Sequence, residues 1–292
     1  MRHKAYKLHE AYKLYERHVR HKAPQKQGRM KIIDCHCHVY PQAIAAKAVK
    51  GVSDFYDGVG DFCDGLASTV RKQWKVKGVD HAVIFSVATK LSQVESINNF
   101  IAKTVSESEG FFTGLGAVHQ DYPDMGQAVE TMVSLGLKGV KLHPDTQFCA
   151  IDDPRLFPLY EACAGRIIVF LHTGDRRYDY SNPDRFKRVL KMFPKTTFVG
   201  AHFGGWSVWE EATRELHGID NLFVDSSSTF HWVEHSKVKD YIRAYGSERV
   251  MFGSDFPMWD VEHEIRYILE LNLTDEEYEN VFHRTAESLF LT

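Results

Sequence analysis

Two histidines that stand two residues apart, His36 and His38, carry the clearest sign of chemistry in this chain. They end the segment IIDCHCH (residues 32–38), whose apolar start predicts a β-strand. Because side chains alternate between the two faces of a strand, both imidazoles are expected to point the same way. Two imidazoles that project together can bind one metal ion, and a bound metal can activate water or polarise a substrate.

More potential ligands follow other apolar runs. His143, His172, His202 and Asp255 each come at the end of such a run. Burying these polar groups without partners would be expensive, and a shared metal ion removes that cost. Any one histidine could instead be a hydrogen-bonded core residue, and Asp255 could be the N-cap of a helix. The complete set favours a metal site over these alternatives.

The segments that must position these residues form a regular series. Short β-rich runs alternate with stretches long enough for a helix and two loops, which predicts an α/β fold of the (β/α)8 TIM barrel type. A doubly wound sheet is the alternative, but no GxGxxG turn follows any of the runs. The expected strands are Lys31–His38, His81–Ala88, Phe111–His119, Leu137–His143, Arg166–His172, Thr197–His202, Asn221–Ser227 and Arg249–Asp255.

Helices are expected between these strands. In a TIM barrel the catalytic groups lie at the carboxyl ends of the strands, which is where the candidate ligands fall. Thr274 and Glu277, three residues apart, predict a capping box at the start of the last helical region. Spaced apolar residues predict further helices at Leu91–Ser108, Met125–Gly136, Pro183–Phe193 and Lys237–Tyr245.

The composition argues against several classes of protein. The 292 residues are 43% hydrophobic and 26% charged, which is typical of a globular protein with a large core. The net charge of −3 argues against nucleic acid as a partner, and no run of about 18 apolar residues predicts a membrane span. Five cysteines without a CxxC pair are typical of reduced thiols in a cytoplasmic protein.

Residues 1–29 differ from the rest, with nine Lys and Arg against two acidic residues. Apolar residues at steps of three and four would give a helix here a narrow apolar stripe. We therefore expect a basic, helical N-terminal extension (1–29) before a single barrel domain (30–292). A docking or membrane-surface helix is one interpretation. The favoured one is a solvated extension, or else residues upstream of a natural start at Met30.

Five motifs in order, IIDCHCH, GVKLHP, FLHTGD, GAHFGG and FGSDFP, resemble the amidohydrolase superfamily. The resemblance is strongest to its amidohydrolase-related branch of small hydrolases and aromatic-acid decarboxylases, and it covers the whole expected barrel. By this resemblance His36, His38, His172 and Asp255 bind a divalent metal, usually zinc. His202 would contact the reacting group or complete the metal site.

These roles imply hydrolysis by a metal-activated water. Zinc can lower the pKa of bound water to about 7, and Asp255 would accept the proton of that water. The metal or His202 would stabilise the oxyanion formed from an amide, ester or lactone. The alternative on the same site is a non-oxidative aromatic-acid decarboxylase, in which the metal binds a substrate carboxylate and hydroxyl. A non-enzymatic metal-binding protein is the third and least favoured class.

Lys141 bears on the number of metal ions. It shares a strand face with His143, and related dinuclear enzymes bridge two metals through a carbamylated lysine on this strand. As an ammonium, Lys141 would instead bind a substrate carboxylate. We expect one zinc ion, with two as the alternative if Lys141 is carbamylated.

Strand alternation also makes a prediction for the neighbours of the two histidines. Cys35 and Cys37 should face the helical layer and pack as small apolar residues. Asp34 should share the face of His36 and His38, in a hydrogen-bonded structural role.

Substrate contacts are expected from Lys141, His143, Arg176 and Trp206. Arginine beside aromatic rings suits a small carboxylated or aromatic substrate, although ordinary loops explain these residues equally well. The expected partner is therefore a small molecule, and assembly as a homodimer is left open.

Overall fold

The computed structural model describes residues 29–60 and 62–292. The chain divides into two units, Met1–Lys31 and Ile32–Thr292, and the second contains every candidate site residue. The helix expected in the basic extension falls on residues 1–28, outside the described part of the chain.

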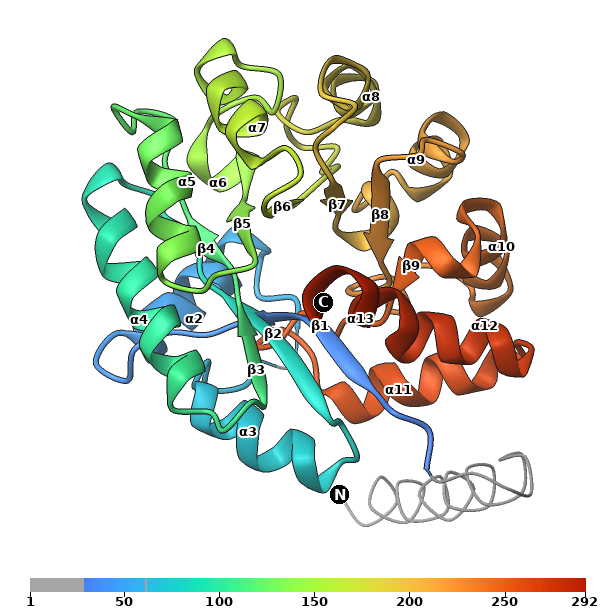
Figure 1. The fold of residues 1–292 in the computed structure, drawn as a ribbon. Helices are drawn as coiled ribbons and strands as arrows, with labels where there is room; N and C mark the ends of the chain where they lie inside the picture. Colours follow the sequence, from blue (N-terminus) through green and yellow to red (C-terminus); the bar gives the residue numbers. More distant parts are fainter. Residues whose placement is uncertain (1–28, 61) are drawn as a thin grey trace. The chain divides into compact units, whose positions relative to one another are not determined.

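Parallel strands in chain order form a closed (β/α)8 barrel (Figure 1). The strands are β1 (Ile33–His38), β2 (His81–Phe85), β3 (Phe112–Gly114), β4 (Gly116–Ala117), β5 (Gly139–Leu142), β6 (Ile168–Leu171), β7 (Phe198–Gly200), β8 (Leu222–Asp225) and β9 (Val250–Met251). Each of the eight predicted strands is present, and the third is divided at Leu115 into β3 and β4. The amide of Cys35 donates to the Phe252 carbonyl and that of His38 to the Phe256 carbonyl, which closes the barrel between β9 and β1.

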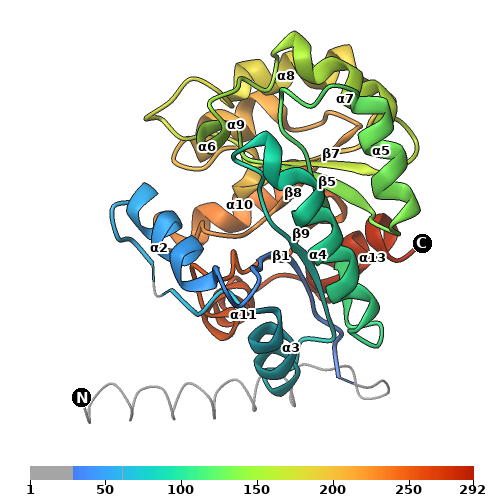
Figure 2. The ribbon, with the colours of Figure 1, turned by 90° about the vertical axis from the view of Figure 1, so that its left-hand side faces the viewer.

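Helices surround the strands as an outer layer (Figure 1). Figure 2 shows α2 at one end of the barrel and α13 at the other. The helices are α2 (Ala45–Phe55), α3 (Ala67–Val76), α4 (Val94–Ser106), α5 (Met125–Ser134), α6 (Pro144–Gln147), α7 (Phe157–Cys163), α8 (Pro183–Met192), α9 (Trp209–Leu216), α10 (His235–Tyr245), α11 (Val261–Glu270), α12 (Asp275–Glu279) and α13 (Thr285–Phe290).

The four helices predicted between strands are confirmed as α4, α5, α8 and α10, within a few residues at each end. The capping box is confirmed as well, because the Thr274 hydroxyl accepts from the Glu277 amide while the Glu277 carboxylate accepts from the Thr274 amide. Among the described residues, no helix is both long and apolar enough to cross a bilayer.

Apolar side chains fill the barrel below the candidate ligands. Because α13 lies across the end away from α2, its apolar residues seal the interior there. The interior cluster consists of Ile33, Cys35, Val83, Phe85, Leu115, Ile168, Phe170, Val199, Ala201, Met251, Ala286 and Phe290.

A β-bulge in β1 overturns the predicted facing of two residues. The register with β2 shifts between Asp34 and Cys37, so that Cys35 and His36 together oppose one residue. Cys35 consequently packs in the barrel interior, and the prediction that it faces the helices is wrong. Asp34 accepts a hydrogen bond from the indole of Trp74 in α3, at 2.7 Å, so it faces the helical layer instead. Its predicted hydrogen-bonded structural role is confirmed.

Candidate metal centre

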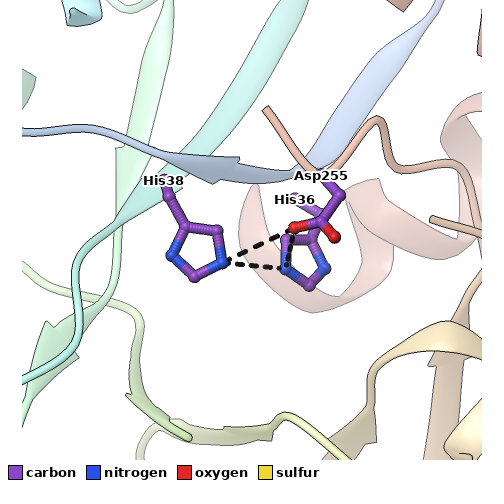
Figure 3. A group of neighbouring side chains, drawn as sticks. All are labelled: His36, His38 and Asp255. Carbon is purple, nitrogen blue, oxygen red and sulfur yellow. Dashed lines mark hydrogen bonds and ion pairs between the residues drawn. The ribbon is translucent and has the colours of Figure 1, made fainter. Parts of the chain in front are cut away.

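Three side chains meet at the carboxyl end of the barrel, two from the end of β1 and one from the loop after β9 (Figure 3). The Nε2 atom of His36 lies 3.2 Å from His38 Nε2 and 3.2 Å from Asp255 Oδ1. Asp255 Oδ1 lies 3.6 Å from His38 Nε2. We call His36, His38 and Asp255 the triad.

The spacing of the triad fits a divalent ion. In a tetrahedral zinc site with bonds of about 2.0–2.1 Å, neighbouring ligand atoms lie roughly 3.3–3.4 Å apart. Two acceptor atoms at such a distance repel each other unless a proton or a cation lies between them. A mixed set of imidazole and carboxylate donors suits several first-row metals, so the donor atoms do not by themselves select zinc.

Asp225, at the end of β8, fixes the orientation of His36. Its Oδ2 atom lies 3.0 Å from His36 Nδ1, so that this nitrogen carries the proton and His36 Nε2 keeps a lone pair toward the triad. Burial alone would raise the pKa of Asp225, but His36 and the Ser227 hydroxyl together hold it below its ordinary value. The sequence analysis missed Asp225, although it ends an apolar run just as Asp255 does.

The lowered pKa of His38 and the strained backbone of Asp255 favour metal binding at the triad. Burial lowers the pKa of His38 well below its ordinary value, which leaves its lone pair available. The backbone of Asp255 has a φ of 61°, and that of His202 a φ of 57°. Few residues other than glycine adopt this left-handed conformation, and such strain tends to gather at functional sites.

His202 contacts His172 rather than the triad carboxylate. The Nδ1 atom of His202 donates to the Ser227 carbonyl at 2.9 Å, so its Nε2 atom can accept a hydrogen bond from His172 Nδ1 at 3.2 Å. This arrangement leaves His172 Nε2 with a free lone pair. Burial lowers the pKa of His202 to about 4, so this histidine is neutral near pH 7.

His172 belongs to a second group, with His143 and Asp145, on the β5 and β6 side of the site. The rings of His143 and His172 stack with centroids 3.9 Å apart, and His172 Nε2 lies 3.7 Å from Asp145 Oδ2. Within the described residues, His172 Nε2 and Asp145 Oδ1 are buried and lack a hydrogen-bond partner. The structure therefore joins three of the four predicted ligands in one group and places His172 in the neighbouring group.

Lys141 lies under the same side of the site, fully buried. Its Nζ atom stands 4.9 Å from the ring centre of Phe85 and 4.3 Å from that of Phe170, with no hydrogen-bond partner in the described part of the chain. Burial lowers the pKa of Lys141 to about 8, against the opposing charges of Asp225 and Asp255. Carbamylation requires such a lowered pKa. The carbamylated lysine and the second ion stay predictions.

A cavity of about 730 Å³ opens above the site. His38, His143, His172 and Asp255 reach its wall, and the Tyr56 hydroxyl, also in the wall, lies 3.1 Å from His143 Nε2. The lining includes neither Lys141 nor His202, so these two residues would act through their neighbours.

Two predicted substrate contacts, Arg176 and Trp206, lie away from this cavity. The Arg176 guanidinium donates to the Ser207 carbonyl and lines a separate surface hollow. Trp206 packs edge-on against Tyr56, at 5.2 Å between ring centres, and so stands behind the cavity wall. The neighbouring Arg177 lies over the same Tyr56 ring, 5.3 Å from its centre.

A chain of hydrogen-bonded side chains fixes the carboxylate of Asp255 on the side away from the two histidines of the triad. The hydroxyl of Ser228 donates to Asp255 Oδ2 at 2.5 Å and accepts from the indole of Trp259 at 2.8 Å. His231 stacks on Trp259, with ring centres 3.5 Å apart, and lies 2.9 Å from Glu264 Oε1. Burial raises the pKa of Glu264 to about 7, although His231 opposes the shift.

Comparison with known proteins places this geometry in a family. The amidohydrolase family model matches residues 33–291. The 2-amino-3-carboxymuconate-6-semialdehyde decarboxylase of Dictyostelium discoideum is 31% identical over 206 residues. That match spans 57% of this chain and 57% of the decarboxylase, so the chain spans little more than half the length of this relative.

Solved structures share the fold. A TIM-barrel protein of Bordetella bronchiseptica has a TM-score of 0.73 at 21% identity, over 89% of this chain and 98% of that one. The 5-carboxyvanillate decarboxylase of Novosphingobium aromaticivorans, with bound manganese and 3-methoxy-4-hydroxy-5-nitrobenzoic acid, has a TM-score of 0.67 at 14% identity, over 93% and 99% of the two chains. At these identities the likeness establishes the barrel fold.

Proposed function

Because the chain belongs to the amidohydrolase family, we propose that it is a metal-dependent decarboxylase that removes CO₂ from a small aromatic or unsaturated carboxylic acid. The sequence alone favours hydrolysis and holds decarboxylation as the alternative. A curated relative and a structural neighbour that are both decarboxylases support the alternative better.

The triad at the base of the cavity carries this proposal. Two imidazoles and one carboxylate lie within 3.6 Å of one another, and both His38 and Asp255 reach the cavity wall. His36, His38 and Asp255 would hold the ion, with His172 as the further ligand that the sequence predicts. Manganese bound in a neighbouring decarboxylase and zinc, expected from the sequence, are both candidates.

When bound, a divalent ion supplies an electrophilic anchor for a substrate carboxylate and an adjacent hydroxyl oxygen. The reaction then needs a proton at the ring carbon that carries the carboxylate. As that proton arrives, the bond to the carboxylate breaks, CO₂ leaves, and the electron pair of this bond restores the aromatic ring. No oxidant or water is consumed.

Side chains in the cavity wall can deliver this proton. Asp255 and His143 both line the cavity and can carry a proton, and we assign the transfer to Asp255 because Ser228 fixes its carboxylate. Asp255 would take up this proton from the solvent-open cavity before each transfer. His202 holds the ring of His172 in place. Apolar residues elsewhere in the wall limit water near the acid, which favours conversion of a charged carboxylate to neutral CO₂.

An assay of CO₂ release tests the proposal. Protein loaded with Mn²⁺ or Zn²⁺ would be incubated with 2-hydroxybenzoates, dihydroxybenzoates and 5-carboxyvanillate, and in parallel with lactones and amides. We expect CO₂ from at least one acid and, in D₂O, one deuterium at the vacated ring carbon. Hydrolysis of a lactone or amide without CO₂ release would contradict the proposal, and so would inert protein with full metal content.

A further inference from the structure

The cavity above the triad changes character along its depth. Imidazoles and the Asp255 carboxylate lie at its inner end, and the rest of its lining is mainly apolar, with Lys47, Lys90, Gln93 and Ser96 among the polar exceptions. One wall of this outer part is a single face of α2 and its first turn, with residues at helical spacing: Ile44, Ala48, Val52 and Phe55. The carboxylate of a substrate would bind at the inner end of the cavity, next to the triad. The outer part of the cavity would then contact the portion of the substrate that lies away from the carboxylate.

Other lining residues come from α4 and from the end of α6. Ile97 and Phe100 of α4 face the cavity together with Phe148. Ile44 is 50% exposed and Phe148 69% exposed, so the outer part is open to solvent. Exposed apolar side chains in the lining of one cavity indicate a surface that a ligand covers.

The size of the cavity exceeds what a lone aromatic acid needs. Pockets that hold drug-sized ligands measure about 300–1,000 Å³, and this one, at about 730 Å³, lies in the upper part of that range. A carboxylated ring held at the triad would fill only part of a cavity of this size.

We propose that the natural substrate carries an apolar arm, an alkyl chain or a second ring, that extends from the acid at the triad into the channel between α2 and α4. This inference rests on the proposed function for the position of the acid. The occupant is the substrate itself because the apolar walls and the triad belong to one continuous cavity. Burial of the arm adds binding energy far from the reacting carbon.

Gly51 provides a variant that closes the channel without disturbing the core. It lies on the cavity face of α2, and a Cβ atom added there would meet no atom within 4 Å, so a larger side chain can begin there without a clash. Replacing a helical glycine should also favour the helix. Ala46, exposed on another face of α2, serves as the matched control.

The test measures affinity along a series of 2-hydroxybenzoates with hydrogen, methyl, propyl or pentyl at the ring position para to the carboxylate. Calorimetry on metal-loaded protein should show dissociation constants that fall about two- to fourfold per methylene, the effect of burying one CH₂ group. G51W should abolish this gain and leave the unsubstituted acid bound as before, whereas A46W should keep it. CO₂ release is measured separately on the same series.

An affinity that does not change with chain length would contradict the proposal of an apolar arm, even if the short acids lose CO₂. A normal chain-length gain in G51W would also overturn it. Affinity that rises with chain length while no acid loses CO₂ would instead contradict the proposed decarboxylation and leave the arm intact. A third outcome combines two results: light scattering shows that G51W disrupts a dimer, and wild type shows no gain in affinity with chain length. In that case a second copy of the chain covers the channel, and the proposal fails.

Discussion

The site has two sides that differ in how their polar atoms are paired. On the β1, β8 and β9 side, His36 bonds to Asp225, and Asp255 is held by Ser228. On the β5 and β6 side, Lys141 Nζ and His172 Nε2 are buried with no hydrogen-bond partner among the described residues. A buried polar atom without a partner is costly, so the first side is built to hold an ion in advance and the second is completed only when a ligand arrives.

The largest expected effect comes from the triad carboxylate. Asp255→Asn keeps the shape of the side chain but removes its charge, so metal affinity should fall sharply and turnover by about 10²–10³-fold or more. Asp145→Asn, on the other side of the site, is the matched control and should retain its metal. Chelator competition and CO₂ release measure the two effects. Equal metal loss in both variants would show that the two sides do not differ as described.

Asp225→Asn tests the contact that orients His36. An amide cannot hold the imidazole proton as a carboxylate does, so we expect metal affinity to fall by about 10–100-fold. Asp220→Asn, on the exposed loop before β8, should have no effect. Unchanged affinity in Asp225→Asn would mean that His36 needs no partner to present Nε2 to the ion.

Ser228→Ala and Ser226→Ala form a matched pair of buried serines. The Ser228 hydroxyl bonds to Asp255, whereas the Ser226 hydroxyl has no partner in the described part of the chain. We expect a few-fold loss of metal affinity and a shifted pH profile of turnover in Ser228→Ala only. Identical behaviour of the two alanine variants would show that the Ser228 hydroxyl does not position Asp255.

The last effect concerns stability behind the site rather than metal binding or turnover. Because the pKa of Glu264 is raised from 4.5 to about 7 in the fold, its contribution to stability is complete below pH 4.5 and is lost as pH rises through 7. The loss amounts to about 3 kcal/mol at most. Urea titrations between pH 4.5 and 8 should show this decline in wild type and a flatter profile in Glu264→Gln. Parallel profiles would show that Glu264 ionises as freely in the fold as in the unfolded chain.

The barrel could be predicted because short apolar runs recur at regular intervals along the chain. The triad could be located because polar functional groups gather at the carboxyl ends of barrel strands. The same rule could have found Asp225, which ends the run Leu222–Val224. The bulge at Cys35 and His36 was beyond prediction, since one extra residue in a strand leaves no mark in composition. Arg176 and Trp206 lie on loops whose paths depend on tertiary packing, and so their distance from the cavity could not be read from spacing.

Metal counting tests the central claim, that the triad forms a site for a single divalent ion, most directly. Wild-type protein, His38→Ala and Lys141→Met would each be loaded with Mn²⁺ or Zn²⁺, desalted and analysed by mass spectrometry for metal per chain. We predict one ion in wild type, one in Lys141→Met and none in His38→Ala. Two ions in wild type, or one ion that survives in His38→Ala, would contradict it.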